Sequence, residues 1–339
     1  MRAVIIDEPR TMHVGDWTAP ECKDDEILVE VGAAGLCAGD MYFYLGKNPY
    51  AKYPQICGHE IAGTVREIGH SVSGFRAGDH VVVEPFIGCG RCYACKIGKS
   101  NCCARLEIIG VHRAGGYAER VVAPANRVHR IPEGMTIAQA AFAEPVAIGV
   151  QACRRGGVAK GELALVLGCG PIGLAVIEVA RSRGARVLAT DTRESRMEAG
   201  ASLGAEILPP GTDLEKEIRD RTEGDGAPVV IEATGVPAVM ARTLDLVAPG
   251  GRVVILGLVG SGVPVAMNGL DFTRKEVTIL GSRASVDCFP ESLRLLGEGE
   301  IRYPRIATQF EMWRAPEVFA EMANDPDRYH KAIFVRDVN

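Results

Sequence analysis

Four cysteines stand close together in the pattern C-x2-C-x2-C-x7-C, namely Cys89, Cys92, Cys95 and Cys103. Four thiolates on a short, glycine-containing loop can enclose one Zn2+ ion as a tetrahedron and leave no coordination position open. The pattern therefore predicts a structural zinc site. A disulfide cluster is the alternative, which is disfavoured because the first residues do not resemble a secretory signal. The spacing favours Cys103 over the adjacent Cys102 as the fourth ligand, without excluding an exchange between them.

A second group of metal-binding residue types lies earlier in the chain. Cys37 and Asp40 stand in one short segment, and His59 and Glu60 are adjacent in another. A catalytic zinc needs about three protein ligands and an open position, and Cys37, His59 and Glu60 supply a thiolate, an imidazole and a carboxylate. Asp40 could hold the second ring nitrogen of His59. From residue types alone, this hypothesis competes on even terms with ordinary burial of a cysteine and a histidine.

A glycine-rich segment after an apolar run carries a nucleotide-binding fingerprint. Gly168, Gly170 and Gly173 follow the spacing G-x-G-x-x-G, and Pro171 and Ile172 open an apolar, helix-like run. The first glycine permits a tight turn, the second lets a pyrophosphate approach the backbone, and the third lets helix and strand pack closely. We expect the phosphates at the helix N-terminus, where free amides favour anions.

Asp191 ends the next strand-like run, RVLATD, at about the distance from the glycines that the dinucleotide fingerprint requires. A carboxylate there can accept hydrogen bonds from both ribose hydroxyls of NAD and would repel a 2'-phosphate, so NAD is favoured over NADP. Arg196, and Arg193 near it, offer guanidinium groups that could hold a phosphate instead. The plainer interpretation of Asp191 is a helix N-cap.

The pattern of apolar residues changes once along the chain. Short alternating runs predict strands in the first part, and strand-like and helix-like runs then alternate, which predicts a parallel sheet with right-handed crossovers. We expect an α/β chain with a mainly-β domain at 1–147 and 284–339 and a nucleotide-binding domain at 148–283. Further cofactor contacts are expected where strands of the second domain end, at Thr234, Gly257, Leu258 and Ser282.

Composition limits the classes of protein to which the chain can belong. Its 339 residues suit two domains, and 47% hydrophobic with 24% charged residues is typical of a globular protein. A net charge of -5 without a basic block argues against nucleic acid or anionic membrane as a partner. Glycines and a proline break the apolar stretch 163–180, which argues against a membrane span. The remaining cysteines lack a disulfide pattern, so we expect reduced thiols and a cytoplasmic location.

Several motifs occur in an order and spacing that together resemble one family. They are GHEIAGTV, GDHVVVEP, GGYAERV, AEPVAIGVQA, GCGPIGL and EATG. The whole chain is similar to zinc-dependent medium-chain dehydrogenases/reductases, in the polyol (sorbitol) dehydrogenase branch. The resemblance implies a GroES-like catalytic domain, a Rossmann coenzyme domain, one catalytic and one structural zinc, and a homo-oligomer, either a tetramer or a dimer.

The same resemblance assigns roles to individual residues. Cys37, His59 and Glu60 match the catalytic zinc ligands, and Glu144 matches a position that binds the zinc or its water. Gly39 departs from the family pattern, which usually places there a serine or threonine whose hydroxyl begins the proton path. Ordered water together with Glu144 is the favoured replacement, and Tyr42 is another.

Candidate substrate contacts lie in three separate segments of the chain. By resemblance, Arg283 matches a substrate-contacting arginine, which could hold a row of hydroxyls or a carboxylate. Phe43 could wall the pocket, although aromatic residues at such positions more often pack in a core. His112, followed by Arg113, precedes a glycine turn and could add a cationic group beside the substrate.

The resulting hypothesis is an oxidoreductase in which zinc polarises a secondary hydroxyl and a hydride passes from that carbon to NAD+. The expected substrate is a polyhydroxylated small molecule, either a polyol or a sugar acid (aldonate), because GVH, GGYAE and GSR resemble bacterial galactonate-type dehydrogenases. The alternatives are threonine- or butanediol-type zinc dehydrogenases, a zinc-free NADPH-dependent reductase of the same fold, and a non-enzymatic metal-stabilised NAD(H)-binding protein.

Overall fold

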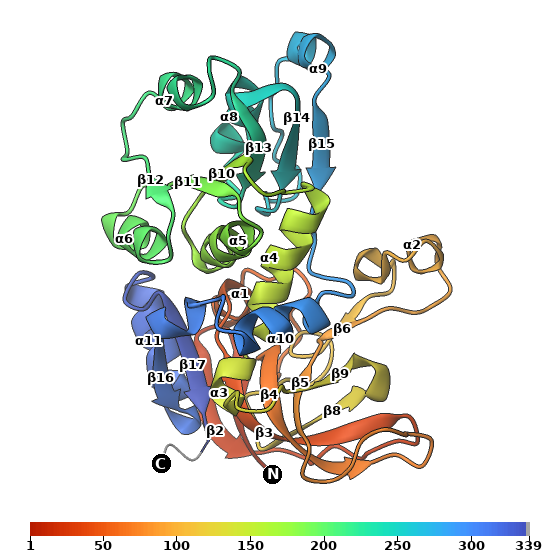
Figure 1. Ribbon diagram of the computed structural model, residues 1–339. Coiled ribbons are helices and arrows are strands. Elements are labelled where there is room, and N and C mark those ends of the chain that lie inside the picture. The colour runs from red at the N-terminus through yellow and green to blue at the C-terminus, as the bar shows by residue number, and fades with distance from the viewer. Residues whose placement is uncertain (337–339) are drawn as a thin grey trace. The chain divides into compact units, whose positions relative to one another are not determined.

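The computed structural model describes residues 1–336, and the chain divides into two compact units (Figure 1). The first, which we call the β-rich unit, comprises Met1–Glu144, Val286–Gly299 and Pro304–Asn339. The second, which we call the α/β unit, comprises Pro145–Ser285 and Glu300–Tyr303. The division falls close to the expected boundaries at 147/148 and 283/284.

A seven-stranded sheet organises the β-rich unit, in the order β16-β17-β3-β4-β5-β9 with β8 paired to β3. Apolar side chains of these strands, such as Val29, Ile61 and Phe334, are buried in one core. Strand β17 pairs antiparallel with β3, so the C-terminal segment completes the unit that the N-terminal segment begins. The strands of the unit are β1 (Arg2–Glu8), β2 (Thr11–Asp16), β3 (Glu26–Gly35), β4 (Glu60–Ile68), β5 (His80–Val83), β6 (Phe86–Ile87), β7 (Glu107–Ile108), β8 (Arg120–Pro124), β9 (Val128–Arg130), β16 (Ala307–Glu311) and β17 (Lys331–Val335).

Short helices connect the strands of this unit. The first of them, α1, begins immediately after Cys37, where Asp40 accepts a hydrogen bond from the Cys37 backbone amide and completes a capping box. The helices are α1 (Ala38–Tyr44), α2 (Tyr93–Lys96), η1 (Ser100–Cys102), η2 (Ala125–Arg127), α3 (Ile137–Ala140), α10 (Phe289–Gly297), η3 (Tyr303–Ile306), η4 (Met312–Arg314) and α11 (Ala315–Asn324), where η marks 3-10 helices.

The α/β unit contains a six-stranded, all-parallel sheet in the order β12-β11-β10-β13-β14-β15. Helices alternate with these strands along the chain, which confirms the predicted α/β class with a doubly wound Rossmann domain. The strands are β10 (Leu163–Leu167), β11 (Arg186–Thr190), β12 (Glu206–Ile207), β13 (Ala227–Glu232), β14 (Val247–Ile255) and β15 (Thr278–Gly281). The helices are α4 (Ala143–Arg155), α5 (Pro171–Ser182), α6 (Glu194–Ser202), α7 (Leu214–Arg221), α8 (Pro237–Leu246) and α9 (Gly269–Lys275).

The described helices include none that is long and apolar enough to cross a bilayer. The longest helix, α4, begins with Ala143 and Glu144, which belong to the β-rich unit, and continues into the α/β unit.

The expected division placed residues 300–303 in the β-rich unit. In the structure they belong to the α/β unit. The cause is the fully buried carboxylate of Glu178 in α5. It accepts hydrogen bonds from the backbone amides of Arg302, at 2.8 and 2.9 Å, and of Tyr303, at 2.6 Å. Arg181 also donates to the carbonyl oxygen of Glu300 at 2.8 Å. The segment is thereby fixed to α5, which composition could not predict.

We predict that Glu178→Ala lowers the free energy of unfolding by about 2–4 kcal/mol, because a buried and a partly buried backbone amide lose a charged acceptor. The measurement is urea unfolding followed by circular dichroism. Exposed Glu198, in α6, provides the matched control, and Glu198→Ala is expected to leave the transition in place. Equal transitions for the two variants would show that the Glu178 contacts do not stabilise this segment.

Candidate functional site

The predicted catalytic ligands come from two segments that the sheet of the β-rich unit brings together. Cys37 follows the end of β3, and Glu60 begins β4 directly opposite Gly35 in the antiparallel register. Each of Cys37, His59 and Glu60 offers one ligand atom, and these three atoms lie within 4.8 Å of one another. A thiolate, an imidazole and a carboxylate at this separation form a donor set that suits zinc.

Asp40 orients this cluster. Its buried carboxylate lies with Oδ1 3.4 Å from Nδ1 of His59. Its Oδ2 accepts hydrogen bonds from the hydroxyl of Tyr117 at 2.8 Å and from the amide of Cys37 at 3.0 Å. Burial alone would raise the pKa of Asp40, but His59 and the donated hydrogen bonds lower it. A carboxylate at Nδ1 leaves Nε2 of His59 for a metal.

Tyr117 was not predicted for this site. Its motif, GGYAERV, gives no sign that the hydroxyl reaches Asp40, which lies 77 positions away in the sequence. The hydroxyl oxygen also lies 3.0 Å from the carbonyl oxygen of Gly35. Tyr117 therefore joins the end of β3 to the residue that orients His59.

Glu60 has a partner that sequence reasoning also missed. Lys331, the first residue of β17, donates from Nζ to Oε1 of Glu60 at 2.5 Å, and both side chains are buried. A buried charge without a partner strongly destabilises a fold, so this ion pair permits the burial of Glu60. Burial tends to lower the pKa of His59, but Asp40 and Cys37 raise it well above its ordinary value. The cluster thus favours a cation at this place.

Glu144, in the first turn of α4, is buried to 1% exposure, and neither of its carboxylate oxygens has a hydrogen-bond partner among the described residues. Burial raises its pKa to about 7, with smaller opposing effects from His59 and Lys331 and a reinforcing effect from Glu60. A buried carboxyl without partners is costly unless a cation, proton or water meets it. Glu144 is therefore a buried acid and not an exposed one.

The four-cysteine segment also forms a cluster. The sulfur atoms of Cys89, Cys92, Cys95 and Cys103 lie within 4.8 Å of one another. Hydrogen bonds from the backbone at Arg91 and Cys92 lower the pKa of Cys89 to about 5. The thiolate form of Cys89, which is the form that binds metal, is thereby favoured over the thiol. Cys103 is buried in the cluster and Cys102 is exposed outside it, so the geometry favours Cys103 as the fourth ligand.

The glycine-rich turn has the geometry that its spacing predicted. Gly168 adopts φ of +101°, which favours glycine. A Cβ on Gly173 would lie 1.9 Å from the carbonyl oxygen of Gly168, so only glycine permits this approach of α5 to β10. Pro171 is the first residue of α5, after the N-cap residue Gly170. The turn therefore presents a helix N-terminus to any bound phosphate.

A pocket of 450 Å3 adjoins this turn in the α/β unit. Five predicted cofactor residues line it: Gly168, Gly170, Asp191, Arg196 and Thr234. Its other wall is largely apolar and was not predicted, and it includes Pro210, Leu214, Val236, Val239 and Leu246. A pocket with an apolar slot beside a carboxylate suits an adenosine group.

Asp191 faces the glycine turn. Its Oδ2 accepts a hydrogen bond from the amide of Cys169 at 2.8 Å, and its Oδ1 accepts one from the amide of Arg193 at 3.1 Å. Arg196 lies 4.0 Å from the same carboxylate. The predicted residues Pro171, Ile172, Gly173, Gly257, Leu258 and Ser282 do not line the pocket, and Leu258 is 88% exposed.

The structure places the predicted substrate residues in different surroundings. Phe43 is 1% exposed and packs in the core against Tyr53, with ring centroids 5.0 Å apart, which favours core packing over a place in a pocket wall. His112 is exposed, and its Nδ1 accepts a hydrogen bond from the amide of Ile108. Arg113 pairs with buried Glu26 at 2.7 Å. Arg283 is exposed in the α/β unit.

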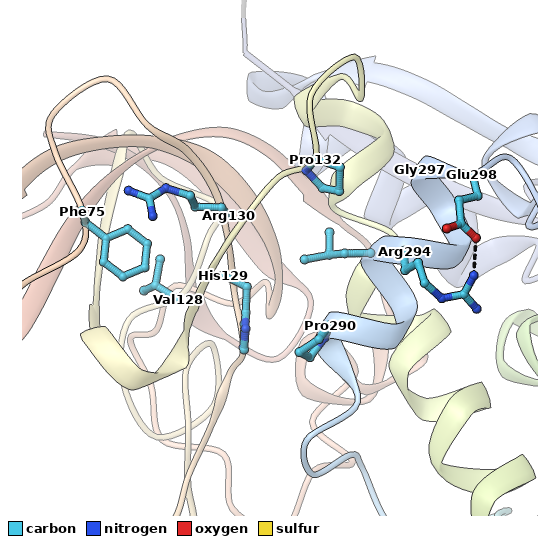
Figure 2. Close-up of a pocket in the computed structure, with 10 residues that line it drawn as sticks. Phe75, Val128, His129, Arg130, Pro132, Pro290, Arg294, Gly297 and Glu298 are labelled. Atoms are coloured by element: carbon cyan, nitrogen blue, oxygen red, sulfur yellow. Dashed lines mark hydrogen bonds and ion pairs between the residues drawn. The ribbon is translucent and has the colours of Figure 1, made fainter.

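Figure 2 shows a further pocket, of 740 Å3, between β9 and α10 of the β-rich unit. Its charged side chains already have partners: Arg294 pairs with Glu298, and Arg130 pairs with Asp79 at 2.7 Å. His129 lies 3.0 Å from the buried carboxylate of Glu84. None of the predicted site residues lines this pocket, so we do not assign it to the reaction.

Comparisons with known proteins agree with this geometry. Residues 23–133 match the alcohol dehydrogenase GroES-like domain, and residues 171–298 match the zinc-binding dehydrogenase family. The chain is 35% identical to L-galactonate-5-dehydrogenase of Escherichia coli, over 89% of this chain and 88% of that protein.

Two solved structures are similar throughout. One is an alcohol dehydrogenase of Escherichia coli complexed with NADH, with a TM-score of 0.91, 29% identity and 99% of each chain covered. The other is a putative zinc-binding dehydrogenase of Sinorhizobium meliloti bound to NADP, with a TM-score of 0.92, 30% identity and 98% of each chain covered. Because likeness of sequence and of fold extends over nearly the whole chain, this protein belongs to the zinc-type medium-chain dehydrogenase family.

Proposed function

We propose that this dehydrogenase transfers a hydride from a secondary hydroxyl of a polyol or aldonate to NAD+, with one catalytic and one structural zinc. The observation that carries the proposal is the meeting of Cys37, His59 and Glu60 within 4.8 Å beside a buried, partnerless carboxyl, Glu144. A zinc-free reductase has no need of such a donor set, so this arrangement favours the zinc-dependent alternative.

The roles of the residues follow from their contacts. Cys37, His59 and Glu60 would hold the catalytic zinc, and Glu144 would hold the ion or a water beside it. A zinc ion there supplies a Lewis acid that polarises the substrate hydroxyl. Asp40 fixes the ring of His59 through Nδ1. The sulfur atoms of the four-cysteine cluster would enclose the structural zinc.

Gly39 leaves the start of the proton path without a side-chain hydroxyl. A Cβ at this position would lie 3.8 Å from Cε1 of His59 and 3.9 Å from Sγ of Cys37, which are ordinary contacts. A methyl group would therefore fit beside the cluster, and its absence leaves room for water. We propose that ordered water together with Glu144 carries the proton away.

The cofactor choice rests on Asp191. Its carboxylate lines the pocket and is held by two backbone amides, in a position to accept the ribose hydroxyls and to disfavour a 2'-phosphate. Arg196 nearby would soften this discrimination. The expected homo-oligomer and cytoplasmic location stay predictions, since a single chain does not test them.

The substrate class is tested by NAD+ reduction at 340 nm across a panel of polyols, aldonates and simple secondary alcohols. We predict that an aldonate or polyol gives the highest kcat/KM. Arg283→Ala should lower kcat/KM for an aldonate by about tenfold or more, because a charge-assisted contact is lost. Exposed Arg274, in the same unit, provides the control variant Arg274→Ala. An equal effect of both variants, or a preference for simple alcohols, would contradict the assignment.

The cofactor assignment predicts that Asp191→Asn lowers the ratio of kcat/KM for NAD+ to that for NADP+ by about tenfold or more, because repulsion of the 2'-phosphate disappears. Asparagine keeps an oxygen that can accept one of the backbone amides. Glu194→Gln, which removes an exposed charge from the first turn of α6, should leave the ratio unchanged. A wild-type preference for NADP+ would refute the assignment.

The structural zinc is tested by metal analysis. We predict about two zinc ions per chain in the wild type and in Cys102→Ser, and about one in Cys103→Ser, because a closed structural site needs all four thiolates. Inductively coupled plasma mass spectrometry gives the count. Loss of zinc from Cys102→Ser, with retention by Cys103→Ser, would reverse the choice of fourth ligand.

A further inference from the structure

The two carboxylate oxygens of Glu60 have opposite surroundings. Oε1 accepts a hydrogen bond from Nζ of Lys331 at 2.5 Å. Oε2 has no hydrogen-bond partner among the described residues, although the side chain is 1% exposed. One oxygen is thus committed to the protein, and the other is left for a ligand that the chain itself does not supply.

Lys331 is fixed at this place by a second acceptor. Its ammonium group donates to the carbonyl oxygen of Leu36 at 2.8 Å, and the residue is 2% exposed. Leu36 lies between the end of β3 and Cys37. The lysine therefore joins the C-terminal strand to the segment that carries one ligand and to the carboxylate of another.

Gly35 provides the space that Oε2 occupies. A Cβ on Gly35 would lie only 1.9 Å from Oε2 of Glu60 and 2.9 Å from its carboxyl carbon. Gly35 stands opposite Glu60 in the β3–β4 register, and its φ is not in the left-handed region. The requirement for glycine is therefore steric, because any side chain would displace the carboxylate.

We propose that Gly35 and Lys331 act together as positioning residues of the catalytic metal site, which hold the carboxylate of Glu60 so that only Oε2 is offered to zinc. This inference rests on the proposed function, since it needs a metal bound by Cys37, His59 and Glu60. Residues that orient a ligand typically change metal affinity by about 10–100-fold when they are replaced.

Positioning and simple electrostatics predict opposite results for Lys331. Removal of the positive charge of Lys331 would make the metal site attract Zn2+ more strongly. Release of the ion would then be slower. Loss of the hydrogen bond to Oε1 would free the carboxylate to rotate and would speed release. The sign of the change therefore separates the two roles.

The test is the rate of zinc release to a chromogenic chelator, measured on the holoenzyme, with the four-cysteine zinc as an internal reference. We expect release from the catalytic site to be about tenfold or more faster in Lys331→Met and in Gly35→Ala, with the slower phase unchanged. Lys331→Arg keeps a donor and should stay within about threefold of the wild type. Gly297→Ala, which adds a methyl group at ordinary contact distance in the same unit but away from the cluster, is the matched control.

The spectrum of the cobalt-substituted protein gives a second readout, because its visible bands follow the geometry of the catalytic ligands. Shifted bands in Gly35→Ala and Lys331→Met, with unchanged bands in Gly297→Ala, are expected. Slower or unchanged zinc release in both variants would overturn the inference, as would equal acceleration at both zinc sites. If Lys331→Met does not fold, the zinc-release rate and the cobalt spectrum of Gly35→Ala test the inference without it. A wild type with only the four-cysteine zinc would instead refute the proposed function.

Discussion

The burial of charge at the start of β4 is the constraint on which the site depends. Glu60 and Asp40 are carboxylates with almost no exposure, and each is tolerated because the fold supplies a partner. Lys331 donates a hydrogen bond to Glu60. Asp40 accepts hydrogen bonds from the hydroxyl of Tyr117 and from the amide of Cys37. Pairing of β17 with β3 brings Lys331 to this place, so the C-terminal strand is needed for the electrostatics of the site as well as for the core.

Local patterns were sufficient for the parts of the site that lie in short segments. Three features could be predicted because each lies within a short stretch of sequence. They are the four cysteines, the glycine turn and the adjacent pair His59–Glu60. The α/β sheet could be predicted because its strands and helices alternate along the chain. The structure brings these residues together: both ligand clusters form, and the turn adjoins a pocket.

The supporting residues could not be found in this way, because folding brings them from distant segments. Lys331 lies 271 positions from Glu60, and no spacing rule links a lysine near the C-terminus to a ligand in β4. Glu178 likewise accepts hydrogen bonds from Arg302, which lies 124 positions away. Phe43 shows a related limit: its position beside a predicted ligand in the sequence does not tell that its face of α1 is buried.

The most direct measurement of the central claim is an anomalous difference map at the zinc edge, from crystals of the enzyme grown with zinc. The account predicts one peak inside the four-cysteine cluster and a second peak at about 2.0–2.3 Å from Sγ of Cys37, a ring nitrogen of His59 and Oε2 of Glu60. A single peak at the cysteines, or a second peak that does not contact Glu60, would contradict it.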